Sequence, residues 1–214
     1  MPREYTALEE NVHDWVGFNK ILFFAMLSLI FFLLTFLQQT LILNEIPAFQ
    51  FGQGSDALLF KIFSGLELVS IPLVYAFKFT LIGFVLWVGC FLWGYRVTYR
   101  QCWQIAMIAE VVFIVPEVIK LFWFLFVQTD PTYWDFTSFY PLSIMNLYDY
   151  ENVATRFWYP NKAINLFEFA YWIALTYGID FAARKKKSIA NSIVVTSYVP
   201  LFLMWLWFYI GVYD

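Results

Sequence analysis

The residues of this chain that could do chemistry are charged side chains inside apolar runs. Residues 101–127 form such a run, long enough to cross a bilayer, and they include Glu110, Glu117 and Lys120. A charge at bilayer depth costs at least about 2.5 kcal/mol unless it is paired or wetted. In one continuous helix Glu110 and Glu117 share a face, because they are seven positions apart, and Lys120 lies beside Glu117. This face must therefore contact protein or water.

Composition and motifs give little support for an enzyme. The 214 residues are 62% hydrophobic and only 14% charged, whereas a soluble domain is typically about 25% charged. The motifs H-E-x-x-H, G-x-S-x-G, C-x-x-C and the P-loop are absent. His13 is the single histidine, and Cys90 and Cys102 form neither a disulfide framework nor a metal motif. We expect no catalysis, cofactor or metal, and the net charge of −3 is too small to indicate a nucleic-acid partner.

The elements that must position these charges are apolar runs of membrane-spanning length. The uncharged run 21–43 is the clearest, because 23 residues at 1.5 Å each exceed the roughly 30 Å core of a bilayer. The predicted spans are 21–43, 68–94, 103–127, 163–183 and 188–211. Residues 44–67 are expected to form a loop, and Pro116 removes a hydrogen bond from the third span. The predicted fold is an all-α integral membrane protein, with a short segment 1–20 followed by one five-helix domain, 21–214.

The distribution of Lys and Arg predicts how these spans are oriented. With the N-terminus in the cytoplasm and the C-terminus outside, eight Lys and Arg residues lie on the cytoplasmic side and three lie outside. The cytoplasmic residues are Arg3, Lys20, Arg96, Arg100, Arg184, Lys185, Lys186 and Lys187, the last four forming a basic turn; the outer ones are Lys61, Arg156 and Lys162. We expect the protein in a bacterial cytoplasmic membrane, with Cys90 and Cys102 reduced.

This orientation places most of the intramembrane charges at one depth. Lys78, Glu117, Lys120 and Glu168 lie about 21–25 Å from the cytoplasmic ends of their spans, and Glu110 about 10 Å. We interpret them as an ion-pair layer that holds the second, third and fourth spans together, with Lys78 near Glu117 or Glu168. A proton or ion path, or a contact with a partner subunit, stays open as an alternative.

The long segment between the third and fourth spans, 128–162, is unusually aromatic. A loop without fixed structure would rarely be so, and we expect an ordered cap at the outer membrane interface, with 141–149 as a candidate short helix. Small and hydroxyl residues in the fifth span suit helix–helix contact. The predicted partner-binding surface combines both: Trp134, Phe136, Phe139, Tyr140, Trp158, Tyr159, Asn191, Thr196 and Ser197.

Several landmarks between residues 82 and 208 resemble the Yip-type integral membrane domain family. They are the connector 92–100, Pro116, segments 141–147 and 165–172, Gly178, the basic turn 184–187 and the apolar last span. The resemblance implies five spans, a cytoplasmic N-terminus and a trafficking or scaffold role in contact with other membrane proteins.

Two classes of function follow from these observations. The first is a non-catalytic accessory or scaffold subunit of a larger bacterial membrane complex, contacting lipids and other integral membrane proteins in a hetero-complex or homo-oligomer. The second is a small transporter, or a channel for ions or protons, that uses the buried charges; the absence of a visible inverted repeat weighs against it. A polar cavity at Glu117 would favour transport, and a dry, paired cluster would favour the scaffold.

Overall fold

The structure is a computed structural model that describes residues 19–46, 55–183 and 187–212. Residues 1–18 and the basic-turn residues Arg184, Lys185 and Lys186 lie outside the described part. Regular structure in the described residues is helical, apart from an isolated bridge between Ser143 and Asn165. The longer helices are α2 (Lys20–Leu41), α4 (Ser55–Leu92), α5 (Tyr99–Ala109), α6 (Ile114–Phe126), α9 (Leu166–Ala183) and α10 (Lys187–Val212).

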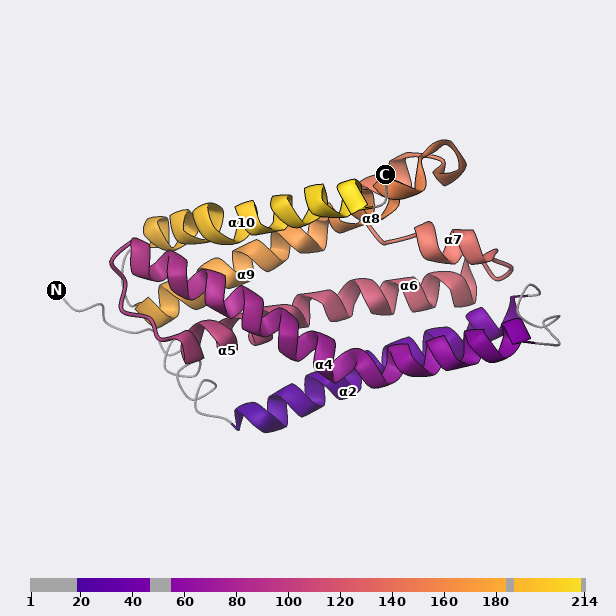
Figure 1. Ribbon diagram of the computed structural model, residues 1–214, viewed down its shortest axis with the longest axis horizontal. Helices are drawn as coiled ribbons and strands as arrows, with labels where there is room; N and C mark the ends of the chain where they lie inside the picture. Colours follow the sequence, from indigo (N-terminus) through magenta and orange to yellow (C-terminus); the bar gives the residue numbers. More distant parts are fainter. Residues whose placement is uncertain (1–18, 47–54, 184–186, 213–214) are drawn as a thin grey trace.

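Three helices within the described residues are long and apolar enough to cross a membrane. They cover Lys20–Glu45, Ile62–Leu92 and Ile189–Val212, with 26, 31 and 24 residues. The chain is therefore a multi-pass integral membrane protein, as the sequence predicts. In Figure 1 these helices run along the long axis of the molecule, together with α9 and with α5 and α6 placed end to end. Taken in chain order, α2, α4, the α5–α6 pair, α9 and α10 run in alternating directions.

Helix α4 is longer than the sequence predicts. It begins at Ser55, so much of the expected loop 44–67 is helical. The loop signals Pro47, Gly52 and Gly54 all precede this start, and the residues after it are compatible with a helix. The helix ends at Leu92, and Gly94, two residues later, has a φ of +72°. The amides of Gly94 and Tyr95 donate to the carbonyls of Phe91 and Cys90, which is a Schellman C-cap.

The predicted third span is two helices rather than one. The 3-10 segment η2 (Glu110–Phe113) separates α5 from α6, and Pro116 lies in the first turn of α6. A proline lacks an amide hydrogen and crowds the carbonyl four residues earlier, which here belongs to Val112. The chain accommodates Pro116 by tightening the turn before it. Glu110 and Glu117 consequently do not share one continuous α-helical face.

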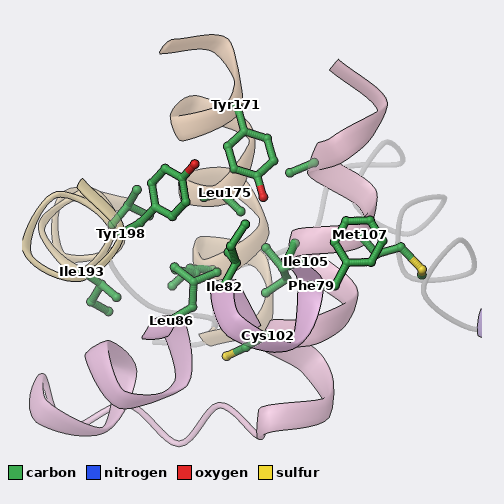
Figure 2. Close-up of a cluster of buried hydrophobic side chains, with 14 of the residues drawn as sticks. Phe79, Ile82, Leu86, Cys102, Ile105, Met107, Tyr171, Leu175, Ile193 and Tyr198 are labelled. Carbon is green, nitrogen blue, oxygen red and sulfur yellow. The ribbon is translucent and has the colours of Figure 1, made fainter. Parts of the chain in front are cut away.

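The main core lies where α4, α5, α9 and α10 meet. Figure 2 shows side chains from these helices pointing toward one another. The core includes Phe79, Leu86, Cys102, Ile105, Met107, Tyr171, Leu175 and Ile193, all of them buried. Gly178 lets α9 approach α5 closely, because a Cβ there would lie only 2.4 Å from Ile105 Cγ2.

The segment between α6 and α9, which we call the cap, is ordered, as predicted, although the candidate helix 141–149 is only a short 3-10 turn. It contains the short helices α7 (Tyr133–Ser138) and α8 (Trp158–Ala163) and three 3-10 turns, one of them at Ile144–Leu147. A capping box between Thr132 and Asp135 fixes the start of α7. Backbone hydrogen bonds from Ile144 to Ile164 and from Leu166 to Leu142 tie the cap to the start of α9.

Candidate functional site

A short ion pair joins Lys78 of α4 to Glu110. The Nζ and Oε1 atoms are 2.6 Å apart, and the side chain of Glu110 is 1% exposed whereas that of Lys78 is 36% exposed. The prediction that Lys78 meets Glu117 or Glu168 is therefore wrong. Lys78 lies 14 residues before the end of α4 and Glu110 lies 11 residues after the start of α5. These offsets correspond to about 21 and 17 Å along antiparallel neighbours, a difference that a lysine side chain can span.

Three aromatic rings surround the Lys78 ammonium group. Its Nζ lies 4.7 Å from the ring centroid of Phe113, 5.8 Å from that of Tyr171 and 5.9 Å from that of Tyr75. Such contacts stabilise a cation that has lost part of its hydration. Two nearby buried oxygens, Glu110 Oε2 and the Tyr171 hydroxyl, have no hydrogen-bond partner. Buried polar atoms are nearly always satisfied, so these two atoms are exceptions within the described structure.

Glu168 of α9 is bound by neutral donors instead of a cation. Its Oε1 accepts hydrogen bonds from Trp172 Nε1 and from the Tyr198 hydroxyl, both at 2.8 Å. Its backbone amide donates to Asn165 Oδ1, which caps the start of α9. Tyr198 belongs to α10, so the buried carboxylate connects α9 to α10.

Glu117 of α6 contacts α2, which the sequence analysis did not associate with the charges. Gln38 Nε2 donates to Glu117 Oε2 at 3.0 Å and to the Glu117 carbonyl at 3.2 Å. The adjacent Gln39 Nε2 donates to Glu67 Oε2 of α4 at 2.9 Å. Two neighbouring glutamines inside an otherwise apolar run were the signal that could have identified this contact. Their amides connect α2 to both α6 and α4.

Lys120 of α6 lies against the cap. Its Nζ is 4.0 Å from the ring centroid of Phe136 in α7, so its described partner is an aromatic ring. The five charged residues therefore do not form one layer. They make separate contacts that join α4 to η2 at the end of α5, α9 to α10, α6 to α2 and α6 to the cap. No group of three or more His, Cys, Asp or Glu residues in the described part could hold a metal ion.

Part of the predicted partner surface faces inward. Phe136 is buried, and with the half-buried Phe139 it packs against Leu121 and Phe124 of α6 and Ile42. This placement corrects the expectation that both rings are available to a partner. Tyr140 is also half-buried. The aromatic content of the segment indicated that it is ordered, but not which rings would point into the protein.

Other predicted surface residues of the cap are accessible. Trp134 is 54% exposed, and its ring packs edge-on against the half-buried Trp158. Tyr159 is 36% exposed, and its ring packs against that of Tyr209 of α10 at a centroid distance of 4.5 Å and a tilt of 31°. Its hydroxyl accepts a hydrogen bond from Trp205. These contacts attach the cap to the last helix and leave an aromatic outer face.

Two of the predicted polar residues of α10, Thr196 and Ser197, contact residues in or just after α4. The Thr196 hydroxyl accepts a hydrogen bond from Trp93 Nε1 at 3.0 Å. Ser197 lies against Gly89, where a Cβ would come within 2.7 Å of the Ser197 Cβ. Ser197 therefore packs against α4 and is only half-buried, whereas Thr196 and Asn191 stay exposed, as the predicted surface requires. Small and hydroxyl residues favour close helix packing, and here the neighbouring helix belongs to the same chain.

Two hollows lie away from the five charged residues. One, of about 370 Å³, lies between α4 and α10 and is lined by residues that include Val85, Gly89, Trp93 and Thr196. The other, of about 600 Å³, lies between α6 and the cap. Neither hollow is lined by Lys78, Glu110, Glu117, Lys120 or Glu168. Comparison with family models, with curated proteins and with solved structures finds no match to this chain.

Proposed function

We propose that this protein is a non-catalytic scaffold or accessory subunit of a bacterial cytoplasmic-membrane complex, and that it acts by binding another integral membrane protein. The main support is the use of its charged residues. Each of the five contacts a side chain on another element of the same chain, and neither hollow described above reaches them. This pattern suits a framework that holds its helices in a fixed arrangement.

The proposed topology has five spans, with the N-terminus in the cytoplasm. The segment Tyr99–Phe126, made of α5, η2 and α6, and the 18-residue α9 add two passes to the three long apolar helices. At 1.5 Å per residue α9 is about 27 Å long, close to the thickness of a hydrocarbon core. The bias of Lys and Arg toward one side supports this orientation.

The proposed contact surface is the outer face of the cap and the exposed side of α10. Trp134 and Tyr159 contribute accessible rings on the cap, and Trp207 of α10 is 77% exposed. Aromatic residues are enriched where interfaces concentrate binding energy. Lipid provides no hydrophobic reason for helices to associate, so a lasting contact within the membrane needs close packing and polar groups.

A second candidate function is proton or ion conduction through the Lys78–Glu110 pair. One observation favours it: Glu110 Oε2 and the Tyr171 hydroxyl are buried without a partner beside a cation that is partly exposed. Such an arrangement could exchange a proton through a bound water.

Purification and flux measurements distinguish the two candidates. Under mild detergent, mass spectrometry should identify a hetero-complex of defined composition, and vesicles containing the purified protein should show no proton flux above that of empty vesicles. The conduction proposal would replace the scaffold proposal if the protein purifies alone and its vesicles conduct protons. The proton flux should then be lost in Glu110→Gln but kept in Glu117→Gln. Glu117→Gln is the matched control because its carboxylate already contacts the neutral amide of Gln38.

A further inference from the structure

The hollow between α6 and the cap has the size and lining of a ligand site. Its volume of about 600 Å³ falls within the range of small-molecule pockets, roughly 300–1,000 Å³. Residues from α6, α7 and the segment that follows α7 line it. None of the five charged residues discussed above is among them, so the site is independent of the charge contacts.

One side of this cavity is apolar and accessible from the surface of α6. It is lined by Ile119, Trp123, Phe139 and Met145. The rings of Trp123 and Phe139 are stacked, with their centroids 5.3 Å apart and their planes at 15°. Ile119 and Trp123 are each 38% exposed, which places the opening on the outer face of α6. An acyl or alkyl chain beside this helix could enter without crossing the cap.

The other side is polar and carries one negative charge. Asp135 lines it with Gln128 and Tyr150, and its Oδ2 accepts hydrogen bonds from the Thr132 amide at 2.8 Å and the Thr132 hydroxyl at 2.6 Å. Partial burial raises the pKa of the Asp135 carboxyl, but these hydrogen bonds and those from Tyr150 and Gln128 outweigh it and hold the pKa below its ordinary value. Asp135 is therefore ionised at neutral pH.

The negative charge has no cation beside it among the described lining residues. Those residues include no Lys or Arg, and the donors to Asp135 are neutral. Lys162 of the cap is directed elsewhere, since its Nζ donates to the Thr137 carbonyl at 2.6 Å. An anionic head group would meet repulsion here. An ammonium group would meet a carboxylate together with the rings of Tyr148 and Tyr150, the combination that recognises alkylated ammonium ions elsewhere.

We propose that this cavity binds an amphiphile with its apolar chain against Trp123 and Phe139 and an ammonium head group beside Asp135. Two sources share this chemistry: a phospholipid with an ethanolamine or choline head group, and a free long-chain alkylammonium ion. The proposal goes beyond the scaffold function, because the cavity could bind its ligand whether or not the protein binds a partner.

Competition between lipids, followed by native mass spectrometry, tests the proposal on the purified full-length protein. The protein in non-ionic detergent is mixed with equal amounts of phosphatidylethanolamine and phosphatidylglycerol, and the retained lipids are counted. The native protein should retain the ethanolamine lipid in roughly fivefold excess, the size expected of one partly exposed ion pair with an aromatic contact. Addition of dodecyltrimethylammonium then separates the sources: displacement of the lipid indicates that a free ammonium ion suffices, and no displacement indicates a phospholipid site.

Two variants and one control connect the lipid preference to the cavity. Asp135→Asn keeps an oxygen acceptor for Thr132 and should remove the preference, whereas Asp130→Asn, the same charge change at an exposed cap position outside the lining, should leave it intact. Ile119→Trp narrows the apolar side without touching the capping box and should reduce retention of both lipids. Equal retention of the two lipids by the native protein, or a preference that Asp135→Asn leaves unchanged, would overturn the proposal.

Discussion

Replacing Lys78 by Met tests how strongly the Lys78–Glu110 pair holds α4 to α5. The substitution preserves most of the volume of the side chain but leaves the Glu110 carboxylate, which is 1% exposed, without its cation. Stranding a buried charge in this way typically costs about 3–5 kcal/mol. Because Lys78 is 36% exposed and retains some hydration, we expect the lower end of this range, about 3 kcal/mol.

Replacing the other member of the pair, Glu110, should destabilise the fold less. In Glu110→Gln the stranded group is the partly exposed ammonium ion, which keeps its contacts with Phe113, Tyr75 and Tyr171. An amide oxygen can also still accept one hydrogen bond, so the expected loss is about 1 kcal/mol. The losses of unfolding free energy in the two single variants should thus differ by about 2 kcal/mol. Lys78→Met should lose more, because the charge that it leaves unpaired is the more deeply buried one.

Unfolding by SDS in mixed micelles, followed by circular dichroism, measures these differences. The double variant Lys78→Met with Glu110→Gln should lose about 2 kcal/mol less than the sum of the single variants, because no buried charge remains unpaired. Glu117→Gln is the control and should change stability by less than about 1 kcal/mol, since Gln38 can still donate to an amide oxygen. Additivity within about 0.5 kcal/mol, or a larger loss in Glu110→Gln than in Lys78→Met, would refute the reasoning.

Three further predictions concern other parts of the molecule. Tyr198→Phe removes one of the two side-chain donors to the buried Glu168 and should destabilise the fold by about 1–3 kcal/mol in the same unfolding assay. Thr132→Ala removes the N-cap side chain of α7 and should lower the free energy of unfolding by about 1 kcal/mol, while Thr132→Ser should be nearly neutral. Because the pKa of Asp135 is depressed in the folded protein, the contribution of its carboxylate to stability is present above pH about 4 and is lost as the pH falls through the folded-state pKa. In a protein without its native cysteines, Trp134→Cys should react with a membrane-impermeant reagent in intact cells and Arg96→Cys only after permeabilisation, and the opposite pattern would invert the proposed topology.

The helices themselves could largely be predicted from hydropathy and punctuation. The starts and ends of α2 and α10 follow the apolar runs, and the Gly94 turn follows from a glycine in the connector. The early start of α4 at Ser55 was missed because Glu67 and its flanking residues interrupt the apolar run without interrupting the helix. A helix can extend beyond a hydrophobic stretch, so hydropathy alone does not locate the first residue of the helix.

The partners of the charged residues could not be predicted from residue counting. A single 3-10 turn before Pro116 changes the direction of Glu110 relative to Glu117, and a lysine side chain spans several ångströms along the helix axis, so equal calculated depth does not identify a pair. The inward orientation of Phe136 was equally hidden, because aromatic content is the same whether a ring faces the core or the surface.

Site-specific photo-crosslinking in living cells tests the central claim most directly. A benzophenone amino acid at position 134, which is 54% exposed, should form a covalent adduct with one defined integral membrane protein. The same probe at position 136, where the native ring is 8% exposed, should yield no such adduct and provides the matched control. The absence of an adduct from position 134, from Tyr159 and from Trp207, together with Glu110-dependent proton flux in vesicles, would contradict the claim that this protein acts by binding a membrane partner.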